Sequence, residues 1–127
     1  MASRTASRPL RAVLVVDALF EFLVGAVLLL FRDDFASGLD VASGAVLLAA
    51  VVFLAAGVAL LVVLAWPADF MVRWVGLLNI AAGIAVWVLV GLRWGSFETD
   101  ARLLTTAIAN MFLALGALQL IAALRAR

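Results

Sequence analysis

The chain has 127 residues, of which 69% are hydrophobic and 13% charged, with a formal net charge of +1. Soluble domains contain roughly 45 to 50% apolar residues, so this composition excludes an ordinary soluble domain and indicates an integral membrane protein. The lack of cysteine, histidine and lysine excludes disulfides, thiolate or imidazole metal sites, and Schiff-base chemistry.

Four apolar stretches are long enough to cross a bilayer. A transmembrane helix needs about 20 residues to span a hydrocarbon core roughly 30 Å thick. The continuous Leu, Val and Ala runs lack the apolar and polar alternation of barrel strands. The predicted helices cover residues 10–31, 41–66, 70–94 and 100–124. The expected fold is therefore all-α and integral to the membrane, a four-transmembrane-helix bundle forming one domain over residues 1–127.

The first predicted helix, 10–31, follows a basic segment that resembles the start of a signal peptide. Its apolar part carries Asp17 and Glu21, and no small-x-small cleavage site follows it directly. We therefore expect this helix to remain in the mature protein.

The next segments alternate between short polar loops and long apolar helices. Residues 32–40 are predicted to form a polar loop, with Asp40 capping the helix that follows. Pro67 ends that helix, and Asp69 is placed to cap the third one.

The distribution of arginines predicts the orientation in the membrane. Four crossings place both termini on one side, and six of the nine arginines fall on that side: Arg4, Arg8, Arg11, Arg73, Arg125 and Arg127. Because cytoplasmic loops carry the excess of basic residues, both termini are expected in the cytoplasm. The use of arginine alone and the Ala, Val and Leu bias suit a GC-rich bacterial genome, so we expect a bacterial inner membrane.

The sequence also contains a weak internal repeat. A shift of 58 residues matches ExxxG in the first helix to NxxxG in the third, and a one-residue insertion brings the second and fourth helices into register. The matched positions are Glu21 with Asn79, Gly25 with Gly83, and FLAAG ending at Gly57 with FLALG ending at Gly116. This pattern predicts two tandem helical hairpins, with chance matching of Leu- and Ala-rich helices as the alternative.

The glycine placement in FLVGAVLLLF and FLAAGVALL resembles that of small bacterial four-helix membrane proteins of the acid-resistance membrane protein and DoxX-like groups. The chain lacks the proline that often follows the first helix in the acid-resistance group. The resemblance implies an architecture of apolar hairpins and does not imply a mechanism.

The best candidates for a functional role are the two acids of the first helix. Asp17, Glu21 and Gly25 stand at i, i+4 and i+8, so they share one helix face. At ~1.5 Å rise per residue, Asp17 lies roughly 8 Å inside the cytoplasmic boundary and Glu21 lies near the midplane. A charged side chain there costs ~2.5 to 3.5 kcal/mol, so this face should point into the protein.

The remaining polar residues supply candidate partners. Asn79 and Asn110 are both near mid-depth and could hydrogen-bond Glu21, while Arg11 and Arg73 could form ion pairs with Asp17. These groups would form an intramembrane polar cluster able to hold a proton or a cation, or one that only holds helices together. Gln119 is not assigned to the cluster, because it lies close enough to the cytoplasmic end to reach water.

Small residues recur at helix-packing distances along the chain. Glycines let helix backbones approach closely, either inside one chain or between two copies. The predicted packing positions are Gly25, Gly57, Gly76, Gly83 and Gly116. We favour internal packing, with a homodimer as the alternative.

The sequence contains no recognisable catalytic triad, metalloprotease motif or phosphate-binding loop, so an enzyme is not expected. The few dispersed arginines also exclude a nucleic-acid surface. We expect no cofactor and no metal, and lipid as the main partner, with a homodimer or larger membrane complex left open. The favoured function is a membrane scaffold or accessory subunit, and the alternative is a small proton- or cation-coupled transporter that uses the acids of the first helix.

Overall fold

The computed structural model describes residues 8–125, and nearly all of them are helical. The elements in chain order are α1 (Arg8–Leu30), α2 (Arg32–Leu39), α3 (Ser43–Ala65), α4 (Asp69–Leu92), the 3-10 turn η1 (Trp94–Ser96) and α5 (Thr99–Arg125). Helices α1, α3, α4 and α5 are each long and apolar enough to cross a membrane. Their ends lie within about two residues of the limits expected from hydropathy.

The segment 32–40 is not the loop that its polarity suggests, because most of it forms the short helix α2. Asp33 and Asp34 lie in its first turn, where the helix dipole favours negative charge. Asp40 does not cap α3. It instead ends α2 in the left-handed conformation, with φ of 53°, and its backbone N–H donates to α2 carbonyls. Ala42 occupies the N-cap position of α3, without a side-chain hydrogen bond.

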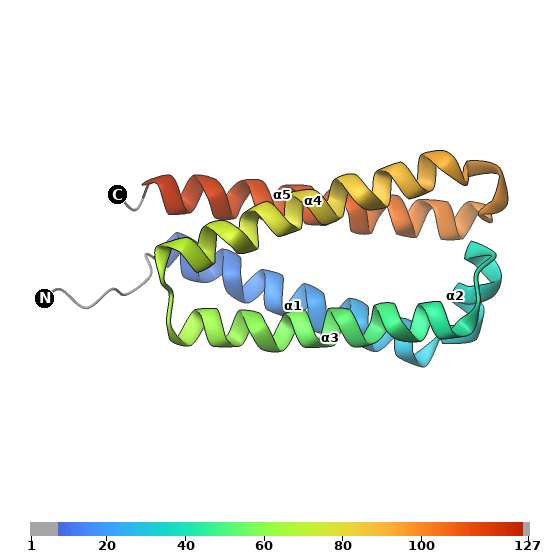
Figure 1. The fold of residues 1–127 in the computed structure, drawn as a ribbon, viewed down its shortest axis with the longest axis horizontal. Coiled ribbons are helices and arrows are strands. Elements are labelled where there is room, and N and C mark those ends of the chain that lie inside the picture. Colours follow the sequence, from blue (N-terminus) through green and yellow to red (C-terminus); the bar gives the residue numbers. More distant parts are fainter. Residues whose placement is uncertain (1–7, 126–127) are drawn as a thin grey trace, which may run out of the picture.

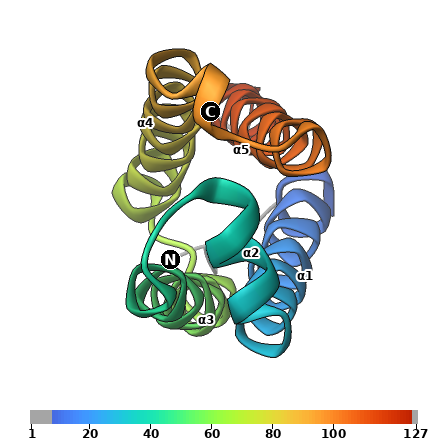
Figure 2. The same cartoon turned by 90° about the vertical axis from the view of Figure 1, so that its right-hand side faces the viewer.

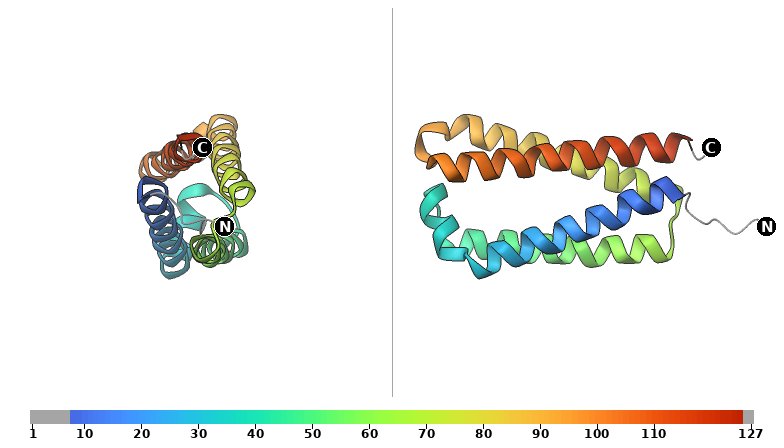
Figure 3. Two further views of the ribbon diagram at one scale, coloured as in Figure 1. Left: turned by 90° about the vertical axis from the view of Figure 1, so that its left-hand side faces the viewer. Right: turned by 180° about the vertical axis from the view of Figure 1, so that it is seen from behind.

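The four long helices pack as two antiparallel pairs. Helix α1 packs mainly on α3, and α4 packs mainly on α5, while the two pairs meet chiefly where α1 approaches α5. The end-on view in Figure 2 shows this arrangement, with α2 lying across one end of the bundle. The start of α1 and the end of α5 lie together at the opposite end, as Figures 1 and 3 show.

Glycines bring the first pair of helices together. A Cβ atom on Gly25 of α1 would lie 2.8 Å from Leu54 and 3.2 Å from the Ala50 carbonyl oxygen of α3. A Cβ atom on Gly57 of α3 would lie 2.9 Å from the ring of Phe22. Since real Cβ atoms do not approach so closely, any larger residue would push α1 and α3 apart.

The second pair of helices is even closer. A Cβ atom on Gly83 of α4 would lie 2.7 Å from Leu113 and 2.9 Å from the Ala109 carbonyl oxygen. Gly76 and Gly116 face each other, and a Cβ atom on Gly116 would lie 2.7 Å from the Gly76 carbonyl oxygen. All five glycines expected to mediate packing therefore make their close contacts inside this chain.

The interior is divided into two apolar clusters along the bundle. One lies toward the end where α1 begins, and its buried members are Leu10, Leu14, Ala18, Leu60, Val63 and Val72. The other lies toward α2 and contains Val24, Leu28, Ala36, Val46 and Ala50. Between them, the rings of Phe20, Phe53 and Phe112 meet with centroids 5.5 to 6.5 Å apart. Such aromatic pairs each contribute about 0.5 to 1.5 kcal/mol beyond burial alone.

The outward faces of the long helices are also apolar. Leu19, Leu23 and Leu78 are each more than 60% exposed, which would be unfavourable in water but suits contact with acyl chains. Among residues 8–125, Asp17 and Glu21 are the charged residues that lie well inside the helical spans, and the others lie near helix ends or in the connections between helices. The fold is that of a multi-pass membrane protein.

Candidate functional site

Asp17 is completely buried at the centre of the bundle. It lies nine residues after the first described residue of α1, or about 14 Å along the helix axis. Its neighbours on the same face, Leu14 and Glu21, are also buried, whereas Val16 and Leu19 are exposed. The acidic face of α1 therefore points into the protein.

Two amide side chains surround the Asp17 carboxylate. Asn79 Nδ2 donates to Asp17 Oδ2 at 2.7 Å and to Gln119 Oε1 at 2.8 Å. Gln119 Nε2 donates to the same Asp17 oxygen at 2.5 Å. These three side chains, here called the polar triad, are at most 6% exposed and close a ring of hydrogen bonds between α1, α4 and α5.

The polar triad connects the two helix pairs. Asp17 belongs to the α1–α3 pair, and both amides belong to the α4–α5 pair. A hydrogen bond to a charged group contributes about 1.5 to 3 kcal/mol, and a buried amide left without a partner costs about 1 to 3 kcal/mol. The other carboxylate oxygen, Asp17 Oδ1, is buried and has no hydrogen-bond partner among residues 8–125.

Glu21 lies one helical turn from Asp17 and is only 4% exposed. No hydrogen bond or ion pair joins its carboxyl group to any residue in the described part of the chain. The expected partner Asn79 is used by Asp17 and Gln119 instead. Glu21 is therefore a buried acid whose polar atoms are not used to hold helices together.

Asn110 does not join this cluster, contrary to the expectation from its depth. Its side chain is exposed and accepts a hydrogen bond of 3.0 Å from Trp87 Nε1. The reason is rotation about the helix axis: Asn110 and Gln119 are nine residues apart, which corresponds to about 180° at 3.6 residues per turn. The two amides of α5 thus face opposite directions, and only Gln119 faces Asp17.

The expected ion pairs with Asp17 are also absent. Neither Arg11 nor Arg73 lies within ion-pair distance of it, within residues 8–125. Arg11 is six residues before Asp17, and Arg73 is six residues before Asn79, so each arginine lies about 120° away from the buried face of its helix. Arg11 is exposed and Arg73 is partly exposed near the end of the bundle.

Gln119 is the member of the site that depth alone did not identify. It lies six residues before Arg125, but its side chain is fully buried rather than reaching toward water. Its signal in the sequence is its spacing: Ala109, Phe112, Gly116 and Gln119 follow at helical intervals and form the buried face of α5. A polar residue on a face of small residues is predicted to be buried whatever its depth.

The other polar residues between positions 8 and 125 add no hydrogen bond to the site. The hydroxyls of Thr105 and Thr106 donate to the carbonyls of Ala101 and Arg102 in their own helix, at 2.6 and 2.9 Å. No group of three or more acidic side chains within residues 8–125 is arranged to hold a metal ion. The arrangement can bind helices together and can hold a proton on a buried acid.

The fold and the site together define an all-helical, multi-pass membrane protein with a buried polar triad. No protein-family model, curated protein or solved structure matches the chain. The resemblance to small four-helix bacterial membrane proteins therefore depends only on the glycine segments and the hydropathy profile.

Proposed function

We propose that the protein is a non-enzymatic membrane scaffold or accessory subunit whose polar triad fixes the arrangement of its helices. The single observation that carries this proposal is the use of Asp17: both hydrogen bonds to its carboxylate come from amides of the other helix pair. One carboxylate oxygen, Oδ2, thus accepts two hydrogen bonds from other helices. A carboxylate held in this way is suited to helix assembly rather than to exchange of a bound solute.

The thin contact between the two helix pairs supports this role. Within each pair, glycines allow close backbone approach, but between the pairs the main contact is that of α1 with α5. Apolar side chains pack against lipid about as well as against another helix, so polar contacts and close packing are what select helix partners in a bilayer. The polar triad supplies such a polar contact between the two helix pairs, where the helices pack less extensively than within each pair.

The contacts of the glycines support an origin as two tandem hairpins. Gly25 faces Ala50 and Leu54, and its counterpart Gly83 faces Ala109 and Leu113, which are the positions expected from the repeat. The same holds for the second helix of each pair, where Gly57 faces Phe22 and Gly116 faces Ile80. The preservation of both partners of each contact favours a repeat over chance similarity between apolar helices.

The proposed setting is a bacterial inner membrane with both termini in the cytoplasm. The start of α1 and the end of α5 lie at one end of the bundle (Figure 1), which agrees with an even number of crossings. The excess of arginine on that side supports the cytoplasmic orientation.

One observation favours a second function, that of a small proton- or cation-coupled transporter. Glu21 is buried, lies close to the middle of α1, and has no hydrogen-bond or ion-pair partner among residues 8–125. Intramembrane acids with no structural partner often mark ion or proton pathways. In this alternative, Glu21 carries the proton and Asp17 remains structural.

A proton-flux assay separates the two functions. Wild-type protein and the Glu21→Gln variant are reconstituted in liposomes that contain a pH-sensitive dye, and a pH jump is applied. The scaffold function predicts flux equal to that of empty liposomes for both proteins. A wild-type flux that is lost in a folded Glu21→Gln protein would establish the transporter instead.

A further inference from the structure

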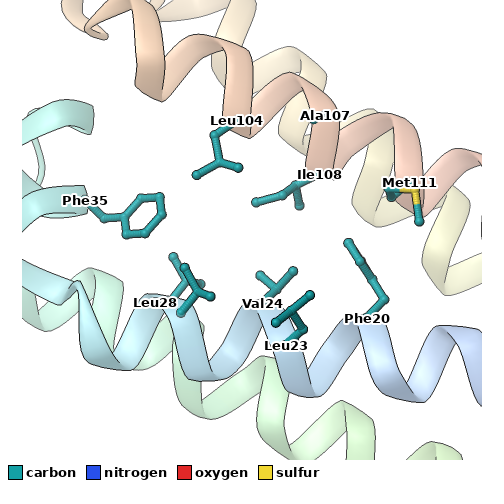
Figure 4. A pocket seen from close by; sticks show the side chains of 10 residues that line it. Phe20, Leu23, Val24, Leu28, Phe35, Leu104, Ala107, Ile108 and Met111 are labelled. Carbon is teal, nitrogen blue, oxygen red and sulfur yellow. The ribbon is translucent and has the colours of Figure 1, made fainter.

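An apolar groove lies between α1 and α5, at the end of the bundle near α2. Its volume is about 240 Å³, and apolar side chains line it. Figure 4 shows Phe20, Val24 and Leu28 on one wall, Leu104 and Met111 on the other, and Phe35 of α2 at one end. The groove is therefore suited to a hydrocarbon chain rather than to a polar solute.

A second pocket of about 240 Å³ adjoins the groove and is lined also by residues of α3 and α4. The two spaces share Leu28, Phe35 and Ile108, so these three side chains form the partition between them. The second pocket is also lined almost entirely by apolar residues, including Val46 and Phe53 of α3. Each space alone is somewhat smaller than small-molecule sites, which begin near about 300 Å³.

An acidic pocket lies next to the groove, and its carboxylates, Asp34, Glu98 and Asp100, are here called the acidic mouth. These carboxylates line a pocket of about 160 Å³ that shares Phe35 and Leu104 with the groove. The apolar groove and the acidic mouth are thus neighbours that meet at these two side chains. All three acids are exposed, so their charges face the region where lipid headgroups and water would lie.

The acids of the mouth have no ion-pair partner among residues 8–125, because the nearby arginines are engaged elsewhere. Arg93 pairs with Asp40 at 3.8 Å. Arg102 donates to the Phe97 carbonyl and lies 4.9 Å over the Trp94 ring. The mouth therefore keeps an uncompensated negative charge beside an apolar groove.

We propose that this groove and its acidic mouth bind a cationic amphiphile. The hydrocarbon part would lie between α1 and α5, and the positively charged head would lie beside Asp34, Glu98 and Asp100. The charge of the mouth selects this ligand: a neutral or zwitterionic lipid could fill the groove but would gain less from three unpaired carboxylates. This site is separate from the polar triad and does not depend on the function proposed for it.

Binding of octyltrimethylammonium tests the proposal directly. The radiolabelled cation is equilibrated by dialysis with the protein in phosphatidylcholine nanodiscs, and its partition into empty nanodiscs is subtracted. We expect saturable binding that 1-octanol, with the same chain and no charge, competes only weakly. The combined variant Asp34→Asn, Glu98→Gln, Asp100→Asn should weaken cation binding at least about fivefold, as expected for loss of several exposed charge contacts.

The chain offers matched controls for both parts of the site. Asp33→Asn removes an exposed acid from the same helix turn that pairs with Arg32 and lies outside the mouth, so it should leave binding unchanged. Ala107→Phe places a ring in the groove and should abolish binding, whereas Leu103→Phe on the exposed face of α5 should not. If the combined acid variant fails to fold, Glu98→Gln alone still tests the mouth.

Four results would overturn the proposal. If Asp33→Asn weakened cation binding as much as the combined acid variant does, the effect would come from the general negative surface potential. If the acid variants bound the cation as well as wild type does, the acidic mouth would not take part in binding. Full binding in Ala107→Phe would place the ligand outside the groove. Equally strong competition by 1-octanol would mean that an ordinary lipid chain occupies the groove.

Discussion

Asn79 of α4 donates a 2.7 Å hydrogen bond to Asp17 of α1, although these two helices make few other close contacts. The bond crosses the bundle between residues 62 positions apart in the chain. Because Gln119 donates to the same oxygen, Asp17 links α1 to both helices of the other pair. Several consequences of this link can be measured.

The first prediction concerns the loss of the carboxylate. Asp17→Leu should leave the Asn79 and Gln119 donors buried without their acceptor and lower the free energy of unfolding by about 2 to 4 kcal/mol. Asp17→Asn keeps an acceptor oxygen and should cost less. Unfolding in mixed micelles with increasing dodecyl sulfate measures both, and equal stability of Asp17→Leu and wild type would contradict a structural role for Asp17.

The two amides of α5 form a matched pair. Gln119→Leu should lower the free energy of unfolding by about 1 to 3 kcal/mol, because it removes an acceptor from Asn79 and a donor from Asp17. Asn110→Leu should cost less than about 1 kcal/mol, because its contact with Trp87 is on the exposed face. The reverse order in the same unfolding assay would mean that α5 is rotated relative to this structure.

The glycine contacts predict different effects on stability for two glycine-to-alanine substitutions on α4. Gly83→Ala should destabilise the protein by about 1 to 3 kcal/mol, because the new methyl group would overlap Leu113 and the Ala109 carbonyl. At Gly91, also on α4, a Cβ atom would meet nothing within 4 Å, so Gly91→Ala should be neutral or stabilise by about 0.5 to 1 kcal/mol. Equal effects of the two substitutions would show that α4 and α5 do not approach at Gly83.

The proposed repeat predicts a new partner for Glu21. Asn79 donates a hydrogen bond to Gln119. In the repeat, Asn79 corresponds to Glu21, and Gln119 corresponds to Leu60. Leu60 is 4% exposed and apolar, which accounts for the lack of a partner for the acid. Leu60→Gln should therefore be tolerated better beside Glu21 than in a Glu21→Leu background, with a coupling energy of about 0.6 to 1.7 kcal/mol. Strictly additive effects in this double-mutant cycle would contradict the tandem hairpins.

The sequence was a good guide to the transmembrane helices because the bilayer imposes a length and an apolar surface on each of them. The four spans follow directly from this requirement, and the burial of Asp17 and Glu21 follows from the cost of exposing charge to lipid. The short helix α2 was missed because its segment is polar, and Ala36 and Gly38 are buried only through the contacts of the finished bundle.

The composition of the polar cluster was predicted only in part. Depth along a helix follows from residue number, but the direction of a side chain depends on which face of its helix packs against the others. Asn110 has the right depth and the wrong direction, while Gln119 shares its face with Gly116 and Ala109. The spacing of small residues was thus a better indicator of burial on α5 than depth was.

The most direct test is a measurement of the distance between the Asp17 carboxyl carbon and labelled side-chain nitrogens by solid-state NMR in lipid bilayers. The structure predicts strong dipolar coupling from Asp17 to the amides of both Asn79 and Gln119, and none to that of Asn110. Loss of the first two couplings, or a strong coupling to Asn110, would contradict the polar triad and the helix arrangement that depends on it.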